Sequence, residues 1–222
     1  MTGLKIVKRV IGEVQTNCYF VVNEENNKAL IIDPAGDIPA DSADYIIKKC
    51  EELKITPVAV LLTHGHFDHT GAVGGLKEKL NIAIYAGEDE KPVLSDPSVN
   101  GLYLFASEAV RRGARPVEAD FWLRDGETIS PCGFPVKIIA TPGHTVGGIC
   151  YYIESENVLF SGDVLFENSF GRTDLPTGDQ NALSNSIINK LFVLPEQTKV
   201  YPGHGGSTSI KYEKKNNPIY NY

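Results

Sequence analysis

The chain has 222 residues, and its 42% hydrophobic and 9% aromatic content excludes a disordered protein because it can build a packed core. Twenty-one basic against 28 acidic residues give a net charge of −7, which disfavours nucleic acid as a partner. Neither a signal peptide nor an apolar run approaching the roughly 20 residues that span a bilayer is visible, so we expect a cytoplasmic protein without a membrane partner.

The first part of the chain alternates short apolar runs with patterns of helical period. Residues 40–53 place Ala43, Ile46 and Cys50 on one helical face. In chain order we expect strands over residues 4–11, 18–22, 29–32, 57–62 and 82–85, and helices over residues 40–53 and 71–80.

Residues 87–120 have no clear period and carry Gly, Pro and Asp, which predicts a lid-like insertion over one face, with a helix over 102–112. Strand patterns return afterwards. We expect strands over residues 136–140, 149–153, 158–160 and 198–201, and a helix over residues 180–193. Since no Pro/Ser/Gly linker divides the chain, residues 1–222 are predicted to form a single α/β domain.

Four cysteines are scattered along the chain without a C-x-x-C pair. They are Cys18, Cys50, Cys132 and Cys150. This spacing favours free thiols in a reducing cytoplasm over disulfides or a thiolate metal site.

All five histidines stand in sequence contexts typical of metal ligands. Three belong to the run THGHFDH over residues 63–69, and the others are His144 in TPGH and His204 in YPGH. Neutral imidazole is the commonest metal ligand. His144, Asp163 and His204 each follow a predicted strand, and strand ends beside Gly or Pro can present side chains from tight turns. We therefore expect these strand ends to converge on one rim.

The spacing of the ligand-type residues predicts two metal positions. His64 and His66 lie two residues apart, so in an extended segment their imidazoles point the same way and can bind one ion. Asp68 and His69 are adjacent, so a turn can direct them to a second ion. The predicted set is His64, His66 and His144 on one ion, Asp68, His69 and His204 on the other, and Asp163 as a bridge. A lone histidine beside glycine is more often a turn residue, so the prediction rests on the whole set.

Nitrogen and oxygen ligands without thiolates suit Zn²⁺, Fe²⁺ or Mn²⁺, and we expect two divalent ions, with zinc favoured. Their four positive charges exceed the three negative charges of Asp68, Asp163 and a bridging hydroxide. The centre should therefore attract anionic groups.

These motifs resemble those of the metallo-β-lactamase-fold hydrolases and, among them, of hydroxyacylglutathione hydrolase (glyoxalase II), especially its compact bacterial members. The match covers residues 63–69, 141–145, 160–163 and 201–204 in the same order. The resemblance implies a four-layer α/β/β/α sandwich with the metals at one edge and the ligand division given above. It also implies that Asp33 orients a metal ligand.

The chain differs from typical glyoxalase II around the substrate. After the bridging aspartate those enzymes carry Gly-Lys-Phe-Tyr, whereas residues 171–174 here read Gly-Arg-Thr-Asp. Arg172 keeps the positive charge and is the candidate contact for a substrate carboxylate. Gly205 and Gly206 stand where those enzymes have Glu-Tyr after the last histidine. The acyl group and the thiol carrier therefore stay open.

The predicted activity is hydrolysis of a small-molecule thioester, resembling hydroxyacylglutathione, by a hydroxide that bridges the two ions. Asp68 would orient the hydroxide and accept its proton. A thiol of pKa near ~8.5 can leave as thiolate, so no dedicated acid is needed. β-Lactamases are less expected, since those with this histidine string lack an aspartate like Asp163.

Two alternatives remain open on the sequence. Persulfide dioxygenases share this fold and a similar Gly-Arg-Thr-Asp stretch, and they hold one iron through two histidines and an aspartate, here His64, His144 and Asp163. A non-catalytic metal-binding module is the other alternative. Metal content, oxygen uptake and thioester turnover would separate the three hypotheses.

Overall fold

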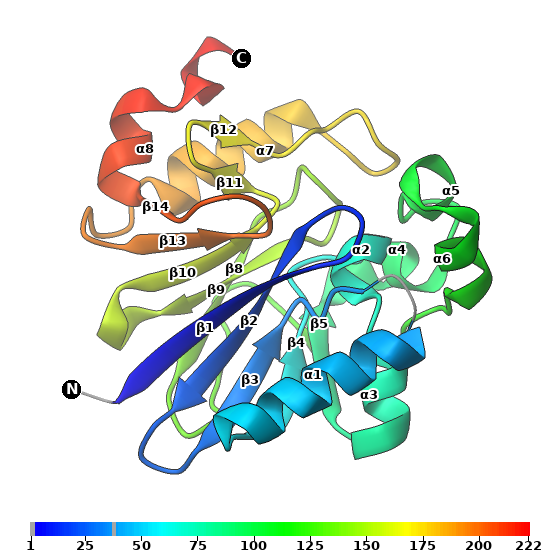
Figure 1. Cartoon of the computed structure of the whole chain (residues 1–222). Helices are drawn as coiled ribbons and strands as arrows, with labels where there is room; N and C mark the ends of the chain where they lie inside the picture. Colours follow the sequence, from blue (N-terminus) through cyan, green and yellow to red (C-terminus); the bar gives the residue numbers. More distant parts are fainter. Residues whose placement is uncertain (1–2, 37–38) are drawn as a thin grey trace.

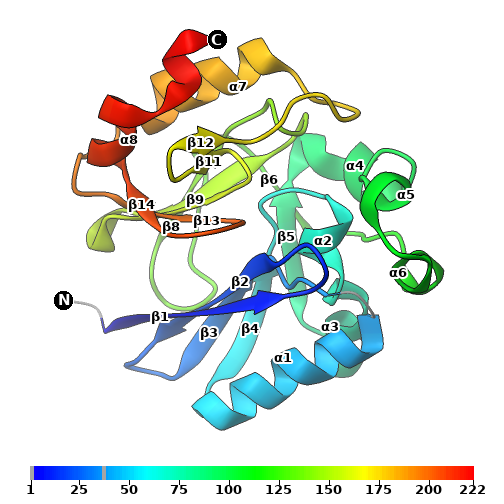
Figure 2. The ribbon, with the colours of Figure 1, turned by 45° about the horizontal axis from the view of Figure 1, so that its top comes forward.

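The computed structural model describes residues 3–36 and 39–222. Two six-stranded sheets pack face to face, and helices cover the outer face of each, as Figures 1 and 2 show. This arrangement confirms the expected four-layer α/β/β/α sandwich. The helices and strands of the two halves follow each other along the chain, so each sheet is built from one continuous part of the sequence.

The N-terminal sheet has the strand order β1-β2-β3-β4-β5-β6. β1, β2 and β3 pair antiparallel, and β3 to β6 pair parallel. The strands are β1 (Leu4–Ile11), β2 (Thr16–Asn23), β3 (Lys28–Ile32), β4 (Thr56–Leu61), β5 (Ala83–Gly87) and β6 (Phe121–Leu123). Because the carboxyl ends of parallel strands meet at one edge, the loop after β4 reaches the edge that carries the histidines.

The C-terminal sheet has the order β14-β13-β10-β9-β8-β7, with β10 and β13 parallel and the other neighbours antiparallel. Its strands are β7 (Thr128–Ile129), β8 (Val136–Ala140), β9 (Ile149–Ile153), β10 (Val158–Gly162), β13 (Lys199–Pro202) and β14 (Thr208–Ser209). A small separate hairpin pairs β11 (Leu165–Phe166) with β12 (Ser169–Phe170).

Three apolar layers hold the sandwich together. The central layer lies between the sheets and includes Leu30, Tyr151 and Phe160. The outer layers pack helices on the sheets, as with Ile46 under the N-terminal sheet and Leu183 on the C-terminal one. Burial of this apolar surface is the main force that stabilises the fold.

The helices are α1 (Pro39–Leu53), α2 (Phe67–Thr70), α3 (Val73–Leu80), α7 (Gln180–Ser186), the π-helical η3 (Ile187–Leu191) and α8 (Ile210–Asn216), with 3₁₀ turns η2 (Glu154–Glu156) and η4 (Pro218–Asn221).

The segment between β5 and β6 contains four short helical pieces and no strand. They are η1 (Glu88–Glu90), α4 (Lys91–Ser95), α5 (Leu102–Phe105) and α6 (Glu108–Gly113). The single helix predicted over 102–112 is wrong, because Ala106 is extended and Ser107 starts a new helix by accepting a hydrogen bond from the amide of Val110. Whether this segment acts as a lid stays a prediction.

Two further expectations can be compared with the structure. The helix predicted over 180–193 exists, but it changes from α7 to a π-helical turn at Ile187. The four cysteines are buried and free. Among the described residues, no helix is both long enough and apolar enough to span a membrane.

Candidate metal centre

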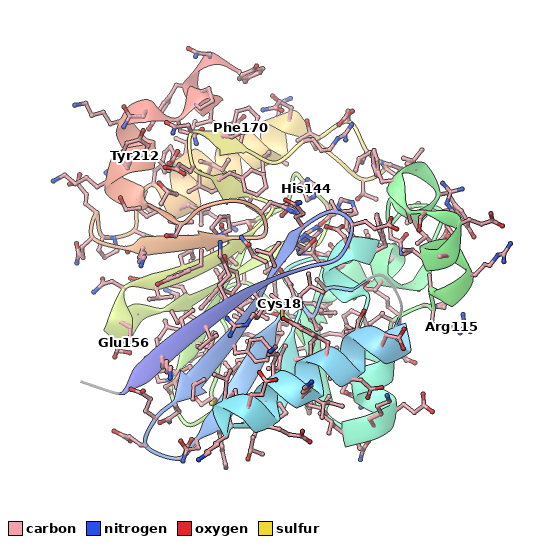
Figure 3. The ribbon with its side chains drawn as sticks, viewed as in Figure 1. Cys18, Arg115, His144, Glu156, Phe170 and Tyr212 are labelled. Carbon is pink, nitrogen blue, oxygen red and sulfur yellow. The ribbon has the colours of Figure 1, made fainter. Side chains whose placement is uncertain are left out.

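All seven predicted ligand side chains come together at one edge of the sandwich, on loops that follow four strands. The first run follows β4, and His144, Asp163 and His204 follow β8, β10 and β13. Figure 3 shows His144 near the tip of the β1–β2 hairpin. The side chains form three groups whose ligand atoms lie within 4.8 Å of one another: His64, His66 and His144; His64, His69 and Asp163; Asp68, His69 and His204.

The first triad consists of His64, His66 and His144. The Nδ1 atom of His66 lies 3.1 Å from Nε2 of His64 and 2.9 Å from Nε2 of His144. His64 and His66 sit in an extended segment before α2, as predicted. Three ring nitrogens that converge in this way, from loops 78 positions apart, form a nitrogen-only ligand set.

The second triad consists of Asp68, His69 and His204. Oδ2 of Asp68 lies 3.4 Å from Nε2 of His69 and 3.3 Å from Nε2 of His204. Asp68 and His69 belong to the short helix α2 rather than to the turn that the sequence suggested. The helix presents both side chains at a second position beside the first triad, where the ring centre of His69 lies 4.1 Å from that of His64.

Asp163 lies between the two triads. Its Oδ2 atom is 3.7 Å from Nε2 of His144 and 3.4 Å from Nε2 of His204, while Oδ1 is 3.4 Å from Nε2 of His69. A single carboxylate therefore faces both positions. The backbone opposite is Gly203, where a Cβ would stand 2.1 Å from Oδ1 of Asp163, so only glycine leaves room for this carboxylate.

Hydrogen bonds on the far side of the imidazoles fix their orientation. Asp33 accepts bonds from the amide and the hydroxyl of Thr63 and from Nδ1 of His69, at 2.8, 2.7 and 2.9 Å. Nδ1 of His64 lies 3.1 Å from the Thr63 hydroxyl, and Nδ1 of His144 lies 2.7 Å from the carbonyl oxygen of Arg172. With Nδ1 engaged in the rings of His64, His69 and His144, Nε2 of these three faces the centre, which is the usual arrangement around histidine ligands, whereas His66 turns its Nδ1 towards the triad.

The site fits a pair of cations. Nε2 of His69 and Oδ1 of Asp163 are buried and have no hydrogen-bond partner within the described structure. Buried polar atoms are rarely left unsatisfied, so these two atoms are suited to bind a cation. The nitrogen and carboxylate donors match the ligand preferences of zinc, iron and manganese. The role of each residue as a ligand nevertheless stays a prediction.

The pKa values of the first triad are low. Burial, together with the neighbouring imidazoles, lowers the pKa of His66 to about 3 and that of His64 well below its usual value. Burial also lowers the pKa of His144, in spite of the nearby charge of Asp163. These imidazoles are therefore neutral at pH 7, the form that binds metal.

The pKa values of the second triad are shifted by its carboxylates. Burial disfavours the charged form of His204, but hydrogen bonds with Asp163 and Asp68 outweigh it and raise the pKa to about 9. Burial also disfavours the charged form of His69, but the charges of Asp68, Asp163 and Asp33 outweigh it and raise the pKa well above its usual value. Burial also opposes ionisation of Asp68, but His69 and His204 lower its pKa to about 2.

Comparison with known proteins agrees with this geometry. The sequence pattern described as the metallo-beta-lactamase superfamily matches residues 11–204. The chain belongs to this superfamily. It is also 38% identical to hydroxyacylglutathione hydrolase GloC of Haemophilus influenzae, over 93% of each chain. This protein is thus a metal-dependent hydrolase of the metallo-β-lactamase superfamily.

Two solved structures are similar over nearly the whole chain. The BLEG-1 B3 metallo-beta-lactamase is 39% identical with a TM-score of 0.84, and the comparison covers 97% of this chain and 99% of the other. TTHA1623, solved in a di-iron-bound form, is 32% identical with a TM-score of 0.78, covering 96% and 99%. Similar proteins with the same fold thus carry different names, and one of them was solved with two irons bound.

A cleft of about 160 Å³ opens onto the metal centre of this superfamily member. Its floor includes His66, Asp68, His144, Asp163 and His204, and its walls include Val14, Phe105, Arg172 and Leu175. The walls come from the β1–β2 turn, α5 and the loop after β12. A substrate that reaches the centre therefore meets mainly apolar side chains and one cation.

Arg172, the predicted substrate contact, lies at this cleft. Its guanidinium donates to both carboxylate oxygens of Asp174 at 2.7 Å and sits 5.1 Å from the centre of the Phe105 ring. The side chain is half exposed. The structure thus places Arg172 where it can contact a substrate, but Asp174 already offsets part of its charge.

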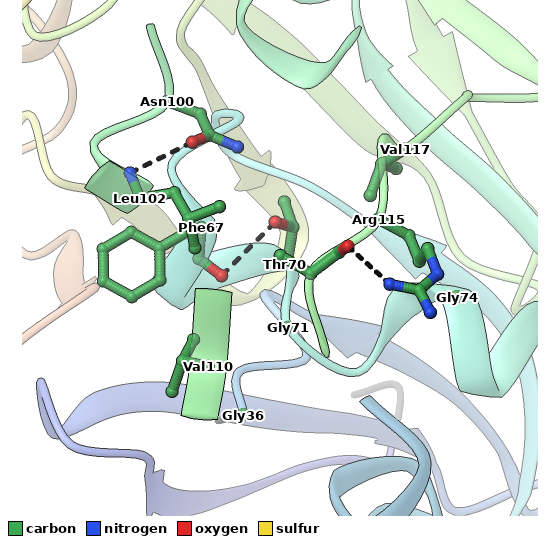
Figure 4. A pocket seen from close by; sticks show the side chains of 11 residues that line it. Gly36, Phe67, Thr70, Gly71, Gly74, Asn100, Leu102, Val110, Arg115 and Val117 are labelled. Carbon is green, nitrogen blue, oxygen red and sulfur yellow. Dashed lines mark hydrogen bonds between the residues drawn. The ribbon is translucent and has the colours of Figure 1, made fainter. Parts of the chain in front are cut away.

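α2 is supported by the segment between β5 and β6. Phe67, between two ligand positions, packs with Leu102, Ala106 and Val110. The amide of Phe67 donates to the carbonyl of Asn100 at 3.1 Å. Figure 4 shows the small cavity of about 30 Å³ beside these residues. The segment predicted as an insertion thus contacts the helix that carries Asp68 and His69.

Sequence reasoning missed two residues that hold the ligands. The Thr16 hydroxyl donates to Oδ2 of Asp68 at 2.7 Å. Glu90 is fully buried and binds the loops on both sides of the first triad. Burial raises the pKa of Glu90 to about 7, although three hydrogen bonds oppose the shift. Neither residue carries a local sequence signal, since Thr16 lies in a strand and Glu90 ends an acidic run.

Proposed function

We propose that this protein hydrolyses small-molecule thioesters of the hydroxyacylglutathione type, with two divalent metal ions, zinc favoured, at the centre described above. The observation that carries the proposal is the convergence of two ligand triads and the shared Asp163 beneath one cleft. The similarity to hydroxyacylglutathione hydrolase GloC supports the substrate class.

The first triad would hold one ion, the second triad the other, and Asp163 would contact both. Two such ions would make hydroxide available at neutral pH and would polarise a substrate carbonyl. Asp68 is ionised at neutral pH and is fixed by Thr16, so it can accept a hydrogen bond from the attacking water and orient it.

The cleft walls suit a thioester. Val14, Phe105 and Leu175 can exclude bulk water around the acyl group. A guanidinium has five N–H donors, so Arg172 can donate hydrogen bonds to a substrate carboxylate while it remains paired with Asp174. A thiol of pKa near ~8.5 can leave as thiolate, so this reaction needs no dedicated acid.

The test is metal analysis of natively purified protein together with turnover of S-lactoylglutathione. The proposal expects two ions per chain and thioester hydrolysis that is lost on chelation and restored by metal. Full occupancy by two ions without hydrolysis of S-lactoylglutathione or of a simple acetyl thioester would overturn it. One iron per chain with oxygen uptake on a persulfide would instead favour the dioxygenase reaction.

A second candidate is β-lactam hydrolysis, favoured by the 39% identity to the BLEG-1 B3 metallo-beta-lactamase. The same ions and cleft could serve a strained amide. Side-by-side kcat/KM values for nitrocefin and S-lactoylglutathione decide between the two, because hydrolysis of the β-lactam alone would exclude the thioesterase proposal.

A further inference from the structure

One buried carboxylate that is not a metal-ligand candidate joins the loops of the first triad. Glu90 ends η1 and is fully buried, whereas Glu88 and Asp89 before it are exposed. Its Oε1 atom accepts a hydrogen bond from the amide of Gly65 at 2.7 Å. Its Oε2 atom accepts bonds from the Thr145 hydroxyl and the amide of Gly147, both at 2.9 Å.

These three donors flank all members of the first triad. Gly65 stands between His64 and His66, and Thr145 directly follows His144. The two loops are about 80 positions apart in sequence, and one backbone bond, from the amide of Ile149 to the carbonyl of Thr63, also joins them. Glu90 therefore holds the relative position of ring nitrogens that must meet at one point.

The three donors favour an ionised carboxylate at this position. Every group that faces Glu90 in these contacts is a donor, and an ionised carboxylate accepts on both oxygens. Glutamine has the same shape, but its NH₂ group would face either the amide of Gly65 or the donors at Thr145 and Gly147. One of the two loops would then meet a donor instead of an acceptor.

The backbone at Glu90 lies in close contact with the loop that follows His144. A Cβ at Gly147 would stand 2.0 Å from the amide nitrogen of Glu90, so the loop after His144 lies directly against η1. The second triad is oriented through other contacts, from Thr16 to Asp68 and from Asp33 to His69. The contacts of Glu90 thus belong to one half of the centre.

We propose that Glu90 is a positioning residue that presets the first triad for its metal ion and leaves the second triad unaffected. This inference rests on the proposed two-ion site. A carboxylate between two ligand loops lowers the reorganisation that metal binding requires, because the three imidazoles already converge.

The test is titration of chelator-treated protein with Co²⁺, followed by its visible absorption bands, which report the ligand geometry of each ion. Glu90→Gln should lower the affinity for one of two ions by about 10- to 100-fold, the usual effect of removing a partner of a metal ligand, and should change the spectrum of that ion. In a His204→Ala background, where only the first triad is intact, Glu90→Gln should cause the same loss. In a His144→Ala background it should have no effect on the remaining ion.

Two matched variants separate positioning from general destabilisation. Glu213 is also fully buried and accepts hydrogen bonds from Thr208 and Asn217, remote from the ligands, so Glu213→Gln should leave both Co²⁺ affinities unchanged. Thr145→Val keeps the charge of Glu90 and removes one bond, so it should weaken the same ion to a smaller degree.

Equal Co²⁺ affinities of wild type and Glu90→Gln, or an equal loss in Glu213→Gln, would overturn the inference. The same holds if Glu90→Gln weakens the ion that remains in His144→Ala. If wild type takes up only one ion, the two-ion proposal fails instead, and the His204→Ala comparison still tests the role of Glu90.

Discussion

The two triads of the metal centre differ in the groups that face their imidazoles. In the first triad, histidines face other histidines, and burial lowers the pKa of His66 to about 3. In the second triad, His69 and His204 face Asp68 and Asp163, and the pKa of His204 rises to about 9. One half is a set of neutral nitrogens and the other a set of ion pairs.

This difference predicts how each half takes up a cation. The first triad is deprotonated at pH 7 and can bind a metal without losing a proton. The second triad must release protons from its imidazoles when it binds a metal. The cation then takes the place of the imidazolium charges that interact with the carboxylates. Asp163 contacts both halves, so it couples the two events.

The largest effect is expected where the two triads meet. Asp163→Ala should remove both ions and lower thioester turnover by more than about 10³-fold, since a catalytic metal contributes several kcal/mol to the transition state. Metal analysis and kcat/KM measure the change. Asp96→Ala, at an exposed turn where the side chain accepts from the amide of Ser98, is the control and should retain both ions. Retention of two ions in Asp163→Ala would show that the carboxylate is not shared.

Removal of a ligand from one half should have a smaller effect. His204→Ala should leave one ion, in the first triad, and lower turnover by about 10²- to 10³-fold through loss of the other ion. His144→Ala is the mirror-image variant and should leave one ion in the second triad. Near-normal hydrolysis in His204→Ala with a single ion bound would refute the two-ion mechanism.

Most of the sandwich and the ligand set follow local patterns in the sequence. β8 and β9 have the bounds predicted from their apolar runs, and the ligands after β8, β10 and β13 stand beside Gly or Pro at strand ends. The helix predicted over 102–112 was wrong because apolar spacing does not reveal the cap at Ser107. Local spacing also gave a turn at Asp68, where tertiary packing of Phe67 favours a helix.

The groups that orient the ligands were harder to predict. Glu90 ends the acidic run Glu88–Glu90, which is typical of an exposed surface, and its partners Thr145 and Gly147 lie more than fifty residues away. Thr16 lies in β2, and the residue pattern of that strand does not predict its hydrogen bond to Asp68. Such contacts depend on how loops from two sheets meet, and this information is not present in any local pattern.

Asp33→Asn tests the orientation of the second triad and should have a moderate effect. The amide keeps one acceptor for Thr63 but loses the charge that faces Nδ1 of His69. In the Co²⁺ titration, the affinity for the second ion should fall by about 10- to 100-fold. The affinity for the first ion should fall less. Asp120→Asn is a matched control, because Asp120 also accepts from a backbone amide but pairs with Lys77 away from the site. A larger loss at the first ion would contradict the assignment.

The smallest effect concerns the stability of metal-free protein as pH changes. The pKa of His204 is about 9 in the folded state and near its ordinary value of 6.5 in the unfolded state, so its stabilisation is full below pH 6.5 and is lost as pH rises through about 9. With chelator present, the melting temperature of wild type should exceed that of His204→Ala by several degrees at a pH below 6.5, and the gap should close as the pH rises above about 9. His66 has a pKa of about 3 and stays neutral over this range, so the gap between wild type and His66→Ala should remain constant. If the His204 gap is also constant, the carboxylates do not hold that imidazole charged, and the contrast between the two triads is lost.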